Sequence, residues 1–193
     1  ELTGGGAMHL NDSLGGCKEL EYVCTLHEQA AAMAAESYAK VVNDISGCLV
    51  TTGPGGTNAL TGLAGAWLDS TPMLVISGQV KRADLKGTTG VRQMGVQEVD
   101  IVSMAAPITK YAVTVTEPAD IRYHMEKAAH LARTGRPGPV WIDIPLDVQG
   151  AMIDEAALRA FDPRETALTG LASPAGISAA VARTIELLNA AER

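Results

Sequence analysis

The feature that most constrains the fold of this sequence is the alternation of short apolar, β-branched runs with longer helical patterns. Runs without a polar alternation are typical of strands buried on both faces of a parallel sheet. The predicted strands are 22–25, 48–52, 73–77, 111–115 and 139–144, and the predicted helices are 27–40, 58–68 and about 118–133. We therefore predict an α/β fold with a mostly parallel sheet and helices on both faces.

Composition narrows the class of protein. The chain has 193 residues, of which 47% are hydrophobic, so it is long enough for a domain with a sizeable core. A net charge of −7 offers no electrostatic footprint for nucleic acid or for an anionic membrane surface, and no apolar run reaches spanning length. The three cysteines, Cys17, Cys24 and Cys48, show no C-x-x-C spacing, which favours a reduced, cytoplasmic location with these thiols in the core.

Glu28 opens an alanine-rich helix that carries few other charges. Alanine has high helix propensity and lets neighbouring elements approach closely, so we expect this helix to be packed on most sides. An acid in a first turn is often only a partner for the helix dipole. An acid held away from water, whose charged form is then disfavoured, can instead share a proton with a ligand. The residues alone leave both interpretations open.

The glycine-rich stretch 53–58 lies between a predicted strand and a predicted helix. Glycines allow positive φ and close ligand approach, and a helix N-terminus offers free N–H groups. The stretch lacks the Gly-Lys-Ser/Thr ending of a P-loop, and Asn58 replaces the third glycine of a dinucleotide-binding motif. His27-Glu28 is no zincin motif either, because Ala31 takes the place of its second histidine, and we predict no metal site.

Together these segments resemble the pyrimidine-binding domain of thiamine diphosphate enzymes, in the acetolactate synthase-like branch, over roughly residues 1–150. The matching positions include His27, Glu28, Ala31 and Ala35, then Gly53, Pro54, Gly55, Thr57 and Asn58. The motifs Ser77-Gly78-Gln79, Val96-Gln97-Glu98, Gly135-Arg136-Pro137-Gly138-Pro139-Val140 and Asp143-Ile144-Pro145 follow in the family's order. Each motif alone is weak, whereas their combination is specific.

The resemblance implies roles for these residues. Glu28 would be the catalytic residue that hydrogen-bonds N1′ of the aminopyrimidine and favours its imino tautomer, which removes the C2 proton of the thiazolium. The cofactor-binding residues would be Glu28, Gly53, Pro54, Gly55 and Asn58, with Gly5, Gly6 and Gln97 on the substrate side. The implied function is the N-terminal domain of a thiamine diphosphate-dependent 2-oxo acid decarboxylase or carboligase.

Two departures from the family bear on the substrate rather than on the cofactor. Val96 stands where acetolactate synthases commonly have phenylalanine, and the stretch 81–94 is longer than usual. The sequence identifies neither the acyl donor nor the acyl acceptor, because the residues that define the substrate in this family come partly from other domains. It does not decide whether FAD is used, because the FAD site of relatives would lie outside this chain.

Residues 151–193 differ in texture from the rest of the chain. We predict a linker and then a helix, from Ser173-Pro174 to about 191, that leads into an absent central domain. The diphosphate-binding domain, which carries the Mg²⁺ ligands in the family, would come from a second subunit of a homodimer or homotetramer acting on a small 2-oxo acid. The chain alone is expected to be inactive. Alternatives are a subunit of a naturally split decarboxylase and a non-catalytic dimerisation scaffold.

Overall fold

A computed structural model describes residues 1–166 and 174–192 of the chain. Contacts divide it into two compact units, Glu1–Asp162 and Pro163–Arg193. The second unit contains helix α7 (Pro174–Ala190), while Ser173, the predicted cap of this helix, lies outside the described residues. The boundary at 150/151 that the sequence suggests stays a prediction.

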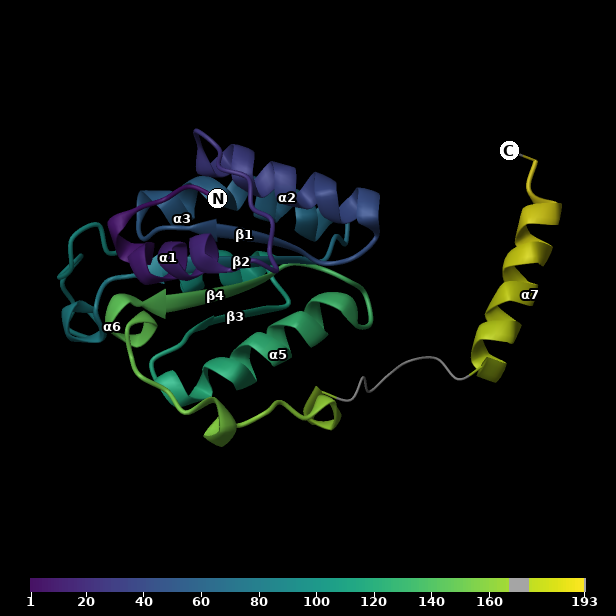
Figure 1. The fold of residues 1–193 in the computed structure, drawn as a ribbon. Helices are drawn as coiled ribbons and strands as arrows, with labels where there is room; N and C mark the ends of the chain where they lie inside the picture. The colour runs from purple at the N-terminus through teal and green to yellow at the C-terminus, as the bar shows by residue number, and fades with distance from the viewer. Residues whose placement is uncertain (167–173, 193) are drawn as a thin grey trace. The chain divides into compact units, whose positions relative to one another are not determined.

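The first unit is built on a four-stranded, all-parallel sheet, as predicted (Figure 1). The strands are β1 (Ser46–Val50), β2 (Met73–Gln79), β3 (Tyr111–Thr114) and β4 (Val140–Pro145), in the order β1-β2-β4-β3. Val75 on β2 pairs with Cys48 on one side and with Trp141 on the other. The strand that comes last in the sequence, β4, lies between β2 and β3 in the interior of the sheet, so residues distant in sequence meet there.

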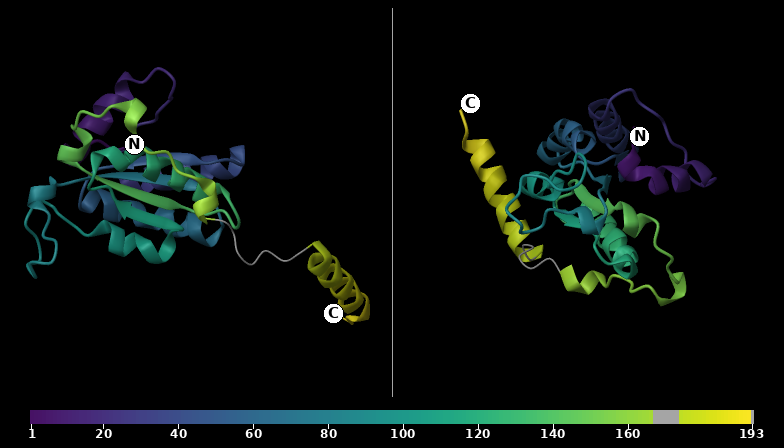
Figure 2. Two further views of the ribbon diagram at one scale, coloured as in Figure 1. Left: turned by 90° about the horizontal axis from the view of Figure 1, so that it is seen from below. Right: turned by 90° about the vertical axis from the view of Figure 1, so that its left-hand side faces the viewer.

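Helices cover both faces of this sheet (Figure 2). On one face, α2 (Glu28–Val42), α3 (Pro54–Leu68) and α4 (Ile101–Ala105) share a core with Val75 and Trp141. On the other face, α5 (Ile121–Arg133) and α6 (Leu146–Gln149) share a core with Ile76 and Ile142. Successive strand residues point to opposite faces, and both faces are apolar, which explains the continuous apolar runs in the sequence.

Helices α2 and α3 approach each other closely through small residues. A Cβ added at Gly62 would lie 2.6 Å from the Cβ of Ala32. Only one stripe of α2 is buried, however, because Tyr38 is 62% and Val41 85% exposed. The expectation that α2 is packed on most sides is therefore wrong for this chain by itself.

The predicted strand 22–25 is also absent from the sheet. Its backbone bonds run to Glu1, whose amino group donates to Val23 O at 2.7 Å and whose carbonyl accepts from Thr25 N at 2.9 Å. Two such bonds do not make a strand ladder, so this segment stays irregular. Apolar composition alone misled the prediction here.

Several helical elements were not predicted or begin elsewhere. Helix α3 starts at Pro54 rather than at 58, because proline suits a first helical position and Gly53 caps the helix. Helix α1 (Met8–Gly16) and short 3-10 turns at Gly5–Ala7, Arg82–Asp84, Ala106–Ile108, Pro118–Asp120, Glu155–Ala157 and Pro163–Thr166 complete the described chain.

The three cysteines, which the sequence places in the core, differ in their burial. Cys48 is buried as expected, but Cys17 is only half-buried and Cys24 is exposed, so the thiols do not all belong to the core.

Within the described ranges, every helix is too short or too polar to cross a bilayer.

Candidate functional site

The glycine-rich N-terminal turn meets the carboxyl ends of β1 and β2, which lie at the left in Figure 1. A Cβ added at Gly4 would lie 2.5 Å from Thr51 Cγ2. A Cβ added at Gly78 would lie 2.0 Å from the carbonyl oxygen of Gly6. The glycine-rich N-terminal turn therefore lies directly against the ends of both strands, and in open α/β sheets this edge is where ligands bind.

Glu28 is buried at the same edge, at the first position of α2. The preceding residue, His27, caps the helix by accepting a hydrogen bond from Gln29 N through its Nδ1 at 3.1 Å. Asn58, within the first turns of α3, donates from Nδ2 to Glu28 Oε2 at 2.9 Å. The carboxylate therefore lies between the N-terminal ends of two helices, where their dipoles favour negative charge.

The second carboxylate oxygen of Glu28 faces a glycine. A Cβ added at Gly55 would lie 3.4 Å from Glu28 Oε1 and 2.7 Å from Thr51 Cγ2. In the part of the chain that the structure describes, Asn58 is the one residue that hydrogen-bonds this carboxylate, through Oε2. Oε1 is thus available to a hydrogen-bond donor on a ligand, and Gly55 lets this oxygen and the Thr51 side chain lie close to its backbone.

Gly53 and Gln97 form a second close contact at this edge. Gly53 has φ 61° and ψ −121°, and a Cβ added to it would lie 2.1 Å from the carbonyl oxygen of Gln97. Gln97 itself has φ 59°. Two backbones with positive φ therefore pack against each other, a combination that requires glycine at position 53.

The family assignment rests on residues 1–104, which match the sequence model described as the N-terminal TPP binding domain of thiamine pyrophosphate enzymes. This region contains Glu28, Gly53, Asn58 and Gln97, the residues that the two contacts bring together. The chain belongs to the thiamine pyrophosphate enzyme family. The predicted resemblance and the predicted α/β fold are both confirmed.

Relatives within this family are similar over most of the chain. An acetolactate synthase large subunit from Lactococcus lactis is 43% identical over 79% of the chain, and an acetolactate synthase from Arthrospira platensis is 48% identical over 70%. A large subunit from Parasynechococcus marenigrum is 38% identical over 97%. These matches cover 25%, 22% and 28% of the relatives, so the chain spans about a quarter of their length.

The predicted site residues of this thiamine pyrophosphate enzyme domain do not all meet at one point. Glu28, Gly55 and Asn58 lie together, and Gly53 contacts Gln97. Gly6 lies beside β1, since an added Cβ would be 2.9 Å from Thr52 Cγ2. Pro54 is exposed as the first residue of α3, and Gly5 is exposed with nothing within 4 Å of an added Cβ. Their roles toward a ligand stay predictions.

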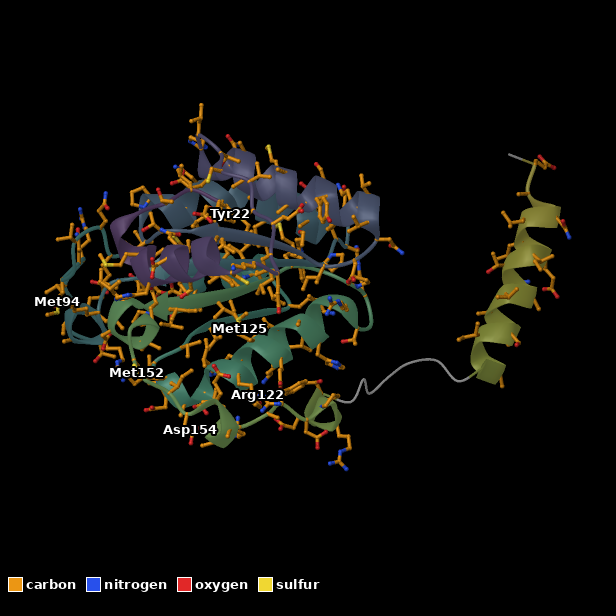
Figure 3. All side chains as sticks on the ribbon, viewed as in Figure 1. Tyr22, Met94, Arg122, Met125, Met152 and Asp154 are labelled. Carbon is orange, nitrogen blue, oxygen red and sulfur yellow. The ribbon has the colours of Figure 1, made fainter. Side chains whose placement is uncertain are left out.

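Residues 80–99, which we call the 80–99 loop, are anchored by a buried carboxylate. Glu98 accepts hydrogen bonds from the backbone N–H groups of Lys86, Met94 and Gly95 at 2.6, 2.9 and 3.3 Å. Burial by itself raises the pKa of Glu98, but these donors outweigh burial and hold the pKa below its usual value. The loop projects from the strand ends, as Met94 shows in Figure 3, and its base is ordered by this residue.

Sequence reasoning missed a polar network inside the sheet, centred on Asp143 of β4. The Asp143 carboxylate accepts from Ser77 Oγ at 2.6 Å, Gln79 Nε2 at 3.0 Å and Thr114 Oγ1 at 3.1 Å. Burial raises the pKa of Asp143 to about 6, although these three hydrogen bonds lower it. A signal was available, because Ser77 and Asp143 interrupt otherwise apolar strand runs.

Proposed function

We propose that this chain supplies the half of a thiamine diphosphate site that holds the aminopyrimidine ring, in an acetolactate synthase-like enzyme. The single observation that supports this best is the buried carboxylate of Glu28, with one oxygen bonded to Asn58 and the other beside Gly55. The full enzyme would decarboxylate a small 2-oxo acid and transfer the resulting acyl group to an acceptor.

The described residues fit the pyrimidine half of this cofactor. A flat heteroaromatic ring needs a hydrogen-bond partner at its edge and a wall without projecting side chains. Glu28 Oε1 is such a partner, and Gly55 projects no side chain toward it. When bound, the cofactor supplies an electron sink for the carbanion that decarboxylation produces.

The chain's own groups would hold and share a proton at one atom. Because Asn58 Nδ2 occupies Oε2, the acceptor that remains for a ring nitrogen is Oε1. Burial of Glu28 keeps bulk water from competing for this oxygen, so hydrogen bonding to the ligand is stronger than in solvent. Gly53 and Gln97 would form the neighbouring wall, with Gly5 and Gly6 toward the substrate.

The remaining parts of the site would come from outside this chain. In the described ranges, no three His, Cys, Asp or Glu side chains gather in a way that could hold a metal ion. We propose that Mg²⁺ and the diphosphate are held by a diphosphate-binding domain of a second subunit, in a cytoplasmic homodimer or homotetramer.

Replacing Glu28 with Gln in the full-length enzyme tests the proposal. The measurement is hydrogen–deuterium exchange at C2 of bound thiamine diphosphate. We expect exchange to slow by about two orders of magnitude or more, the range typical of a lost acid–base group. Exchange at the wild-type rate would show that Glu28 has no part in activation.

Glu36→Gln is the matched control. Glu36 lies two turns further along α2 and pairs with Lys40 at 2.6 Å, away from the strand ends. C2 exchange should keep its wild-type rate in this variant. Calorimetric titration of the wild-type enzyme with thiamine diphosphate and Mg²⁺ tests the scaffold alternative, because a scaffold would show no binding.

A further inference from the structure

The side-chain amide of Gln79, at the end of β2, is 2% exposed and uses both of its polar atoms twice. Its Oε1 accepts from Thr52 Oγ1 at 2.8 Å and from Val80 N at 3.0 Å. Its Nε2 donates to Asp143 Oδ2 at 3.0 Å and to Val99 O at 3.1 Å. A buried amide with all of these bonds made is fixed in one orientation, because rotation would leave buried groups unpaired.

Three of the four partners of Gln79 belong to the walls of the candidate site. Thr52 immediately precedes Gly53, and Val80 and Val99 are the first and last residues of the 80–99 loop. Between these ends, the carbonyl of Gln97 packs against Gly53. One side chain thus joins both ends of the loop to the turn on which the loop rests.

Asp143 gives this side chain a rigid base. Its carboxylate is bonded by Ser77 and Thr114 as well as by Gln79, so it links β2, β3 and β4 in the centre of the sheet. Trp141 Nε1 in turn donates to Ser77 Oγ at 2.8 Å. A charge-assisted network of this kind, whose central carboxylate is buried and bonded through both oxygens, holds its members more firmly than a single hydrogen bond.

We propose that Gln79 is a positioning residue of the cofactor site, which sets the spacing between the Thr52–Gly53 turn and the 80–99 loop and thereby places Gln97. The inference rests on the proposed function, because it assigns Gln97 to the substrate side. Gln79 has no bond to Glu28 or Asn58. Loss of Gln79 should therefore impair substrate turnover more than activation of the cofactor.

The test replaces Gln79 with Met, which has a similar length and no hydrogen-bonding amide, in the full-length enzyme. We expect backbone amide exchange across residues 80–99 to accelerate at least tenfold. We expect kcat/KM for the 2-oxo acid to fall at least tenfold, while C2 exchange of bound thiamine diphosphate stays within about threefold of wild type. A parallel fall of C2 exchange and kcat/KM would indicate a merely structural role and would overturn the proposal.

Thr114→Val is the matched control. The substitution removes another donor to the same Asp143 oxygen, and the Thr114 hydroxyl has no bond to the 80–99 loop. Amide exchange of the loop should stay at the wild-type rate in this variant. If Thr114→Val and Gln79→Met loosen the loop equally, the effect belongs to the sheet as a whole and Gln79 does not position the site.

Thr52→Val keeps the proposal testable if Gln79→Met does not fold. It removes one hydroxyl donor to Gln79 Oε1 and leaves the other three bonds in place. Amide exchange of residues 53–57 should rise at least threefold, and unchanged exchange would contradict the link to the turn. Failure of the proposed function gives a different pattern, because Glu28→Gln would then leave C2 exchange intact whatever the Gln79 variants do.

Discussion

Asn58 donates a hydrogen bond to Glu28 across 30 positions of sequence, at 2.9 Å, and so joins the N-terminal ends of α3 and α2. The bond leaves one carboxylate oxygen of Glu28 for a ligand and fixes the direction in which that oxygen points. Asn58 thus orients the acid on which the proposed chemistry depends.

Replacing Asn58 with Ala should slow C2 exchange of bound thiamine diphosphate by about tenfold, without loss of the fold. A hydrogen bond to a charged acceptor contributes about 1.5–3 kcal/mol, and Glu28 would lose its donor among the described residues. Thr57→Val is the control, since the Thr57 hydroxyl donates to Pro54 O at 3.2 Å and has no bond to Glu28. Equal rates in the two variants would contradict an orienting role for Asn58.

Replacing Gly53 with Ala should lower the free energy of unfolding by about 1–3 kcal/mol from backbone conformation alone. The clash with Gln97 O, at 2.1 Å from an added Cβ, adds to this cost and should displace the 80–99 loop. The measurement is denaturant unfolding of Gly53→Ala beside that of Gly47→Ala. Gly47→Ala is the control, because an added Cβ at Gly47 meets nothing within 4 Å and should change stability by less than about 0.5 kcal/mol. Similar losses in both variants would show that the Gly53–Gln97 contact is unimportant.

Much of this architecture could be predicted because the information is local. Apolar runs at β1, β2 and β4 and small-residue helices at α2 and α3 follow from composition and period, and the order of motifs pointed to Glu28 and Asn58. The prediction of a strand at 22–25 was wrong because a strand needs a partner along its length. The described backbone bonds of this segment reach only Glu1.

The polar network around Gln79 and Asp143 could not be predicted in the same way. Its side-chain to side-chain bonds join residues 27 to 66 positions apart, and which strands are neighbours depends on the placement of β4 in the centre of the sheet. Sequence pattern marks polar residues inside apolar strands as unusual. The pattern does not say that these residues bond to one another.

Replacing Glu98 with Gln should loosen the turn between Lys86 and Gly95. The amide can accept through only one oxygen, whereas the carboxylate accepts from three backbone N–H groups through two oxygens. The measurement is proteolysis after Arg92, whose rate should rise several-fold. Glu117→Gln is the control at an exposed position outside the loop, and protease should cut this variant after Arg92 at the wild-type rate. An unchanged rate in Glu98→Gln would mean that the loop is held by other contacts.

The buried carboxyl of Asp143 should make stability fall as pH rises from about 4 to 6. Its pKa is about 6 in the folded chain, against 3.8 for an unperturbed aspartate. The folded state therefore holds a proton in this window that the unfolded state has lost. Stability decreases with pH wherever the folded state binds more protons, and the difference between these pKa values corresponds to about 3 kcal/mol. Carboxyls with lowered pKa, such as Glu98, act in the opposite direction below about pH 4.5.

Asp143→Asn isolates this contribution. The variant loses stability at every pH, because its single amide oxygen cannot accept at both carboxylate positions, which receive Ser77 on one oxygen and Gln79 and Thr114 on the other. It also loses the titration, so the stability difference from wild type should shrink as pH rises from 4 to 6. Denaturant unfolding of both proteins at several pH values measures this difference. Parallel stability curves would show that Asp143 titrates alike in the folded and unfolded chains.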